Sequence, residues 1–170
     1  MIKKEDIKMK KFVKIIMGSE KDFEFCKNIG QTLSKFGIQY EYHVGSAHKT
    51  PEIVLEILDE NEKDLNLVYI TVAGRSNALS AFVDYNTPYP VIACPPYSDK
   101  YGGVDIFSSL RTPSGSGLIT VLEPEAAGIA AVKIFGLNDK EIAKKIENHQ
   151  EELKEKISKA DKEVKKYGKC

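Results

Sequence analysis

Residues 38–72, IQYEYHVGSAHKTPEIVLEILDENEKDLNLVYITV, contain the pattern of a strand, a helix and a second strand. Apolar residues alternate over Ile38–Val44, recur at helical spacing over Pro51–Asp64, and fill Leu67–Val72 without interruption. An uninterrupted apolar strand is typical of a parallel sheet that is covered on both faces. The segment therefore predicts a β-α-β unit with a right-handed crossover.

The same alternation continues on both sides of this unit. Before it, the chain predicts a strand over Phe12–Met17 and a helix over Phe23–Phe36 that ends at Gly37. After it, the pattern predicts short helices over Asn77–Tyr85 and Val104–Leu110, strands over Pro90–Cys94 and Leu118–Leu122, and a helix that begins at Pro124. Five strands with helical connections predict an α/β fold of three layers, a flavodoxin-like doubly wound parallel sheet.

The residues from Asp139 onward follow a different pattern. Apolar side chains such as Ile142, Ile146 and Leu153 recur at steps of three and four residues, and lysine and glutamate fill the other positions. This predicts a long amphipathic helix of ~25 residues and ~38 Å. We therefore expect an α/β domain over residues 1–137 and a C-terminal helical extension over residues 138–170, which packs on the core or on a neighbouring subunit.

Composition narrows the class of protein. The chain has 170 residues, of which 42% are hydrophobic, and its 25 basic side chains balance 25 acidic ones, so no net charge attracts nucleic acid or a membrane surface. Met1–Lys11 is basic but lacks the apolar run of a signal peptide, and no stretch approaches the ~20 apolar residues of a membrane span. We expect a cytoplasmic protein. Cys26, Cys94 and Cys170 are widely spaced and indicate neither a disulfide framework nor a thiolate metal site.

Short polar loops follow four of the predicted strands, at residues 17–22, 46–51, 73–77 and 94–96. In a parallel sheet all four lie at the carboxyl edge, where open α/β sheets bind ligands. Gly18 allows close approach of a ligand, Ser19 and the helix amides can hold phosphate, and the Asp22 carboxylate suits ribose hydroxyls. Neither a Walker P-loop nor Gly-x-Gly-x-x-Gly is present, so the loops favour a smaller phosphorylated ligand.

Residues 46–51, SAHKTP, place His48 in one of these loops. Imidazole, with an unperturbed pKa of ~6.5, both accepts and donates a proton near neutrality, so His48 is an acid/base candidate. Ser46 or Thr50 can cap the helix that follows, and Pro51 suits its first position. The alternative is a capped turn with an exposed histidine, and the residues alone leave both open.

Other polar residues have structural alternatives as well. The loop 111–117, RTPSGSG, either wraps a ligand or is a glycine-rich connection. Asn77 can serve as the cap of the following helix. Asp105, Glu123 and Glu125 are separated acids at helix starts, where carboxylates favour the helix dipole, and they do not resemble a metal cluster.

Several motifs occur in a fixed order between about Phe12 and Leu137. They are Met17-Gly18-Ser19 with Asp22, Ser46-Ala47-His48-Lys49-Thr50-Pro51, Val72-Ala73-Gly74-Arg75-Ser76-Asn77, Tyr89-Pro90-Val91-Ile92 with Cys94-Pro95-Pro96, Ser108-Ser109-Leu110-Arg111 with Pro113-Ser114-Gly115, and Ile134-Phe135-Gly136-Leu137. Together they resemble the aminoimidazole ribonucleotide carboxylases of purine biosynthesis. One departure is Lys21, which stands where the family commonly has a serine.

The resemblance covers two classes of enzyme. One class is a mutase that acts on N5-carboxyaminoimidazole ribonucleotide and typically has Ser-Ala-His-Arg-Thr-Pro and a second histidine in the third loop. The other class carboxylates aminoimidazole ribonucleotide directly with carbon dioxide. Lys49 and residues 74–77, GRSN, resemble the second class, so we expect the direct carboxylase. The mutase is the first alternative, and a non-catalytic flavodoxin-like nucleotide-binding module is the second.

The resemblance also implies roles for individual residues. His48 is the expected general acid/base, and the expected substrate-binding residues are Ser19, Asp22, Ser46, Lys49, Gly74 and Ser76. The substrates are a small ribonucleotide and carbon dioxide, and the reaction requires no metal, biotin or ATP. The family is usually a homo-octamer in which the C-terminal helix reaches a neighbour.

Overall fold

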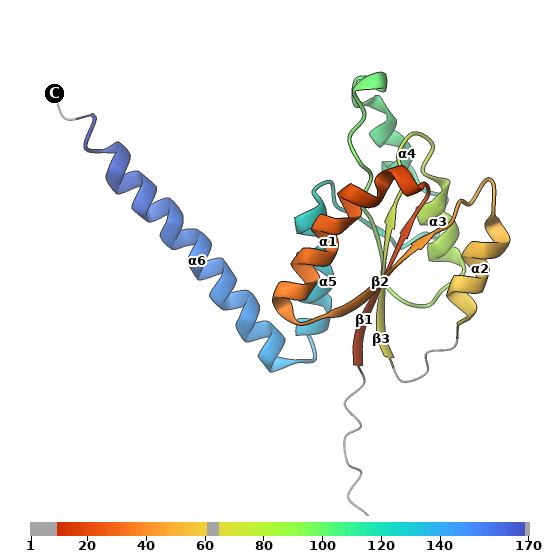
Figure 1. Cartoon of the computed structure of the whole chain (residues 1–170), viewed down its shortest axis with the longest axis horizontal. Coiled ribbons are helices and arrows are strands. Elements are labelled where there is room, and N and C mark those ends of the chain that lie inside the picture. Colours follow the sequence, from red (N-terminus) through yellow and green to blue (C-terminus); the bar gives the residue numbers. More distant parts are fainter. Residues whose placement is uncertain (1–9, 61–64, 169–170) are drawn as a thin grey trace, which may run out of the picture. The chain divides into compact units, whose positions relative to one another are not determined.

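The computed structural model describes residues 10–60 and 65–168 (Figure 1). Most of the basic N-terminal stretch and Cys170 lie outside the described residues. The strands are β1 (Lys10–Met17), β2 (Gln39–Val44), β3 (Leu65–Val72), β4 (Val91–Ala93) and β5 (Ile119–Thr120). The α-helices are α1 (Phe23–Phe36), α2 (Pro51–Asp59), α3 (Ala78–Tyr85), α4 (Phe107–Leu110), α5 (Pro124–Gly136) and α6 (Lys140–Val164). The 3-10 helices are η1 (Glu20–Asp22), η2 (Asp99–Tyr101) and η3 (Val104–Ile106).

All strand pairs of the sheet are parallel, and the strand order is β2-β1-β3-β4-β5. This is the flavodoxin-like order, in which the direction of winding reverses between β1 and β3. Met17 is in register with Val44 of β2 and with Val72 of β3, so these three strands end level with one another. The helices α1 and α5 lie on one side of the sheet and α2 and α3 on the other (Figure 1). The predicted fold class is confirmed.

The two faces of β1 serve different parts of the core. Ile16 belongs to a buried cluster with Val54 of α2 and Val83 of α3, whereas the neighbouring Ile15 points to the opposite face. On that opposite face α5 approaches α1 closely at Gly128, where a Cβ atom would lie 2.9 Å from Thr32 Cβ. A glycine is therefore needed at this crossing.

Three element boundaries test the sequence predictions. The helix over Phe23–Phe36 is confirmed to the residue, and Gly37 ends it with a φ of 75°. The second predicted helix ends at Asp59, earlier than expected, and residues 61–64 lie outside the described part. The fifth strand is only Ile119–Thr120, shorter than the predicted Leu118–Leu122, because only two of its residues pair with β4.

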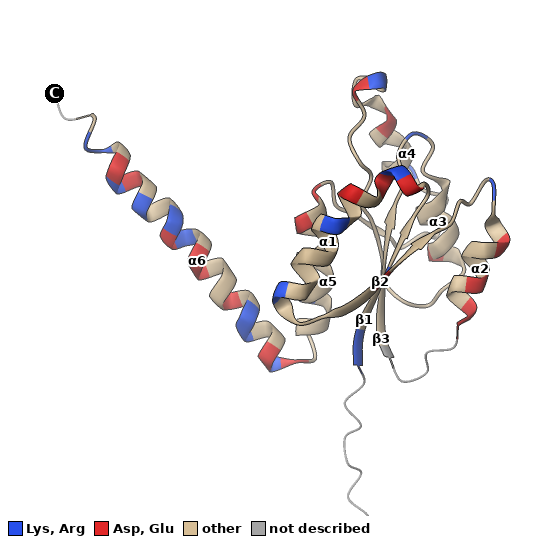
Figure 2. Ribbon diagram, viewed as in Figure 1, with Lys and Arg blue, Asp and Glu red and all other residues tan. Residues whose placement is uncertain are grey.

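The chain divides into one compact unit that ends at Ala131 and a second that begins at Val132. The second unit contains α6, whose 25 residues confirm the predicted long helix. Asp139 caps it by accepting hydrogen bonds from the backbone N–H groups of Glu141 and Ile142. Charges of both signs occur along α6 (Figure 2). The expected domain limit at residue 137 stays a prediction.

Two further observations concern the helices and the cysteines of the described residues. No helix in the described part of the chain is long and apolar enough to cross a membrane. Cys26 and Cys94 are buried free thiols, and burial raises the pKa of each to about 12, so both remain protonated at neutral pH.

Candidate active site

Three loops meet at the carboxyl edge of the sheet. The backbone N–H of Gly18 donates to Val72 O at 2.9 Å, which joins the loop after β1 to the end of β3. The N–H of Gly45 donates to Met17 O, also at 2.9 Å, and joins the loop after β2 to the end of β1. The loops therefore lie side by side at the point where the winding direction reverses, which is the usual ligand position in such sheets.

The loop after β2 is a tight turn that carries His48 outward. Ser46 N–H donates to Thr50 Oγ1 at 3.1 Å, and Thr50 N–H donates back to Ser46 O at 2.9 Å. Lys49 N–H donates to Ser46 Oγ at 3.3 Å. Thr50 occupies the cap position of α2, in agreement with the prediction, but no side-chain capping hydrogen bond is made, because the hydroxyls of Ser46 and Thr50 both bond inside the turn. These bonds fix the backbone on both sides of His48, whose side chain is exposed.

The loop after β1 holds Ser19 and Asp22. Ser19 Oγ accepts a hydrogen bond from Lys21 N–H at 3.3 Å and so caps η1. Asp22 occupies the cap position of α1, but its carboxylate makes no capping hydrogen bond. Burial raises the pKa of Asp22 above its usual 3.8. A half-buried carboxylate that is not used by the helix is available to a ligand.

Hydrogen bonds to Asp105 and Ser108, in η3 and α4, hold the loop after β3 in place. Arg75 adopts a φ of 58°, and its N–H donates to Asp105 Oδ2 at 3.0 Å. Ser108 Oγ donates to Arg75 O at 2.6 Å and accepts from Asn77 N–H at 3.1 Å. Asp105 therefore has a definite partner, beyond the helix-start role expected from the sequence. Ser76 remains exposed between these anchored residues.

A cleft of about 440 Å³ lies beside this loop. Its lining residues are Ala47, Ser76, Asn77, Ala78, Ala81, Phe82, Tyr85, Asn86, Ser108, Arg111, Thr112 and Pro113. Of the predicted site residues, Ser76 lines the cleft directly, and His48 directly follows Ala47, which also lines it. His48 itself does not line the cleft, and neither do Ser46 and Lys49 of the same loop, Gly74 of the loop that carries Ser76, or Ser19 and Asp22 of the loop after β1.

A buried hydrogen-bond chain supports the loop after β3 and the start of α3. Thr71 Oγ1 donates to Ser80 Oγ at 2.8 Å, and Ser80 Oγ donates to Asn77 Oδ1 at 2.8 Å. Asn77 Nδ2 in turn donates to Ser109 Oγ at 3.0 Å. Asn77 also accepts from Ser80 N–H, which confirms the predicted cap of α3. The sequence alone did not reveal that the same amide ties α3 to α4.

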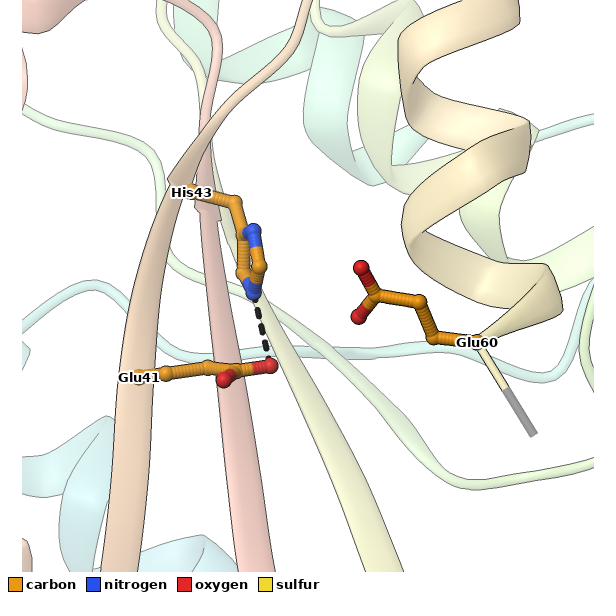
Figure 3. A group of neighbouring side chains, drawn as sticks. All are labelled: Glu41, His43 and Glu60. Carbon is orange, nitrogen blue, oxygen red and sulfur yellow. Dashed lines mark ion pairs between the residues drawn. The ribbon is translucent and has the colours of Figure 1, made fainter. Parts of the chain in front are cut away.

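A second group of ionisable side chains lies on β1, β2 and the end of α2. Glu41, His43 and Glu60 are the one set of possible metal ligands among the described residues, and His43 Nε2 lies 2.7 Å from Glu41 Oε1 (Figure 3). However, the fully buried Lys14 ammonium lies 2.7 Å from Glu60 and 3.4 Å from Glu41. A divalent cation at this point would face that positive charge at close range. The group is therefore an ion cluster around the buried Lys14.

Comparison with known proteins identifies the family. Residues 12–156 match the family model described as AIR carboxylase. The chain belongs to the AIR carboxylase family. Phosphoribosylaminoimidazole carboxylase from Archaeoglobus fulgidus is 55% identical over 150 residues, which are 88% of this chain and 83% of that protein. The enzyme of the same name from Treponema denticola is 47% identical over 159 residues, 93% of this chain and 100% of that protein.

One further relative and one solved structure are also similar to this chain. A bifunctional carboxylase and succinocarboxamide synthetase from Mus musculus is 46% identical over 128 residues, 75% of this chain but 30% of that protein. The crystal structure of Treponema denticola PurE matches with a TM-score of 0.88 at 46% identity, and the match covers 92% of this chain and 99% of that chain. The family resemblance expected from the motifs is confirmed.

Proposed function

We propose that this protein is a phosphoribosylaminoimidazole carboxylase, which adds carbon dioxide reversibly to C4 of 5-aminoimidazole ribonucleotide. The observation that carries the proposal is the position of the exposed His48. It is held in a hydrogen-bonded turn, and Ala47, the residue before it, lines the cleft. The proposal also draws on the family and on relatives named for this activity.

The chemistry requires one group that moves a proton. The amino group makes C4 of the imidazole nucleophilic, so C4 attacks the carbon of carbon dioxide and a C–C bond forms while one C–O π pair becomes a carboxylate lone pair. C4 is then tetrahedral and still carries its hydrogen. His48 accepts that proton, and the C–H electron pair restores the aromatic ring. In the reverse direction the imidazolium returns the proton to C4 and carbon dioxide leaves. General acid/base catalysis of this kind contributes ~10²–10⁴-fold.

The substrate-binding residues in this proposal come from three loops. Ser19 and Asp22 bind the ribose phosphate group, Ser19 at the phosphate and Asp22 at the ribose hydroxyls. The Asp22 carboxylate makes no capping hydrogen bond, which supports this role. Ser46 and Lys49 hold the polar groups of the nucleotide. Gly74 and Ser76 border the base and the carbon dioxide. Ser76 supports its role by lining the cleft. The scheme requires no metal, biotin or ATP.

The direct carboxylase is favoured over the mutase by the histidines of the chain. The mutase class typically has a second histidine in the loop after β3, whereas residues 73–77 read AGRSN. The two other histidines are His43, which pairs with Glu41 on β2, and His149 on α6.

A substrate assay tests the proposal. Purified protein is given aminoimidazole ribonucleotide with bicarbonate as the source of carbon dioxide, and in parallel N5-carboxyaminoimidazole ribonucleotide. We expect product from the first mixture at a rate proportional to dissolved carbon dioxide. Product from the second mixture alone would identify the mutase, and product from neither would favour the binding module.

We further propose a cytoplasmic homo-octamer in which α6 contacts a second copy of the chain. Exposed apolar side chains along α6, among them Ile157 and Val164, support a contact of this kind. Light scattering of the full chain tests it, since the mass of a monomer would exclude the assembly.

A further inference from the structure

The cleft contains one arginine in a chain that has very few. Only Arg75 and Arg111 are arginines among the 25 basic side chains. The guanidinium of Arg75 lies over the Tyr101 ring, 6.0 Å from its centroid, and Arg75 does not line the cleft. Arg111 does line it and is the one charged residue among the lining residues. It therefore sets the charge of the cleft.

Arg111 has no competing partner in the part of the chain that the structure describes. Its side chain is exposed, and no ion pair or side-chain hydrogen bond is found for it there. Phe82 and Ala81 from α3 provide an apolar wall of the same cleft. An unpaired guanidinium beside an apolar wall suits a flat ring that carries an anionic group.

We propose that Arg111 binds the carboxylate that the reaction adds at C4, an inference that rests on the proposed function. The nucleotide has two anionic groups when carboxylated. Its phosphate is assigned to Ser19 and its ribose hydroxyls to Asp22, and neither residue lines this cleft. Ser76, assigned to the carbon dioxide end, lines the cleft together with Arg111. The guanidinium fork matches a planar carboxylate with two parallel hydrogen bonds. Because the carboxylate charge develops during C–C bond formation, Arg111 stabilises the transition state as well as the product.

The backbone holds Arg111 in place on both sides. Its N–H donates to Phe107 O of α4 at 3.1 Å. On the other side, Asp84 Oδ2 accepts hydrogen bonds from Ser116 Oγ at 2.8 Å and Gly117 N–H at 2.9 Å. The Tyr85 hydroxyl donates to the carbonyl of Ser114 in the same loop. The loop 111–117 is thus fastened to α3, so Arg111 is positioned before a ligand binds.

Calorimetry with two ligands tests the inference. Dissociation constants of 5-aminoimidazole ribonucleotide and of its 4-carboxylated product are measured for the wild type and for Arg111→Gln, Arg111→Lys and Arg75→Gln. We expect Arg111→Gln to weaken binding of the product ~10–100-fold and binding of the substrate less than ~3-fold. Lysine restores part of the loss because it keeps the charge without the fork. The matched control Arg75→Gln leaves the ratio of the two constants unchanged.

The other outcomes separate this inference from the proposed function. Equal losses of affinity for both ligands would assign Arg111 to the shared phosphate or to the structure of the loop. No loss of affinity would exclude Arg111 from the site. Either result overturns the inference while wild-type carboxylation stands. A wild type that neither binds the two nucleotides nor converts them overturns both proposals. The thermal midpoint of each variant shows whether it is folded.

Discussion

The Lys14 ammonium lies 2.7 Å from the Glu60 carboxylate, although Lys14 stands within β1 and is fully buried. It also donates to Ile57 O at 3.1 Å, so it joins the sheet to the last turn of α2. The same helix begins immediately after the turn that carries His48. This partly buried ion pair therefore holds one end of the helix whose other end adjoins the proposed catalytic turn.

Replacing Lys14 tests how much this pair stabilises the fold. Lys14→Met keeps most of the buried volume but leaves the carboxylates of Glu41 and Glu60 without their cation. We expect the free energy of unfolding to fall by about 3 kcal/mol. This is the lower end of the range for breaking a buried ion pair, because the side chains of both glutamates reach solvent. Urea unfolding measures it. The control Lys27→Met breaks an exposed pair with Glu24 and costs about 0–1 kcal/mol; equal losses in the two variants would contradict the expectation.

The same pair predicts a pH dependence of stability. The hydrogen bond from Lys14 lowers the pKa of Glu60 below its usual 4.5. A carboxyl whose pKa is lower in the folded state contributes stability above its unfolded pKa and loses it as the pH falls through the folded value. The difference in unfolding free energy between wild type and Glu60→Gln should therefore shrink once the pH falls below about 4.5. A constant difference from neutral to acidic pH would show that Glu60 contributes no stability through its charge.

His48→Asn tests the proposed acid/base. We expect carboxylation to be abolished while the affinity for aminoimidazole ribonucleotide stays within about tenfold, because proton transfer is lost and binding contacts remain. Turnover assays and calorimetry on the same preparation measure the two quantities. Near-normal turnover in this variant would remove His48 from the mechanism.

Asp22 predicts that substrate binding depends on pH. Burial raises the pKa of Asp22, so its carboxylate takes up a proton at a higher pH than an ordinary aspartate does. If the ionised form accepts hydrogen bonds from ribose hydroxyls, the affinity for the nucleotide falls on acidification through that raised pKa. Asp22→Asn should bind more weakly at neutral pH and lose this pH dependence. Unchanged affinity in Asp22→Asn would leave Asp22 with a role only at the start of α1.

The fold was largely predictable because local patterns determine it. The helix over Phe23–Phe36 has a helical period and a glycine at its end that adopts a positive φ, and both signals are local. The length of β5 depends instead on how far it pairs with β4, which no local pattern records. Lys14 shows the same limit. Its partners Glu41 and Glu60 are distant in sequence, and its burial cannot be predicted from its position in an apolar run.

The candidate site was predictable to the level of loops. Parallel strands bring the loops of Ser19, His48 and Ser76 to one edge, so their proximity follows from the alternation of strands and helices. The cleft itself depends on how α3 and the loop 111–117 pack, and that packing uses contacts between residues about thirty positions apart. From the sequence, Arg111 was therefore noted only as part of a glycine-rich loop and of one family motif, without a role in the site.

Asp84 provides a last test, because it fastens that loop without lining the cleft. Asp84→Ala removes the acceptor of the Ser116 and Gly117 hydrogen bonds and loosens the loop, which keeps the Tyr85–Ser114 hydrogen bond to α3. If Arg111 binds the product carboxylate, the affinity for the carboxylated nucleotide falls several-fold while the affinity for the substrate changes little. We also expect a loss of about 1 kcal/mol in unfolding free energy, since the bonds are partly exposed. Calorimetry and urea unfolding measure the two effects, with Asp99→Ala as a control for removal of a surface carboxylate. A less stable Asp84→Ala with wild-type affinity for the product would show that the loop holds Arg111 without this anchor.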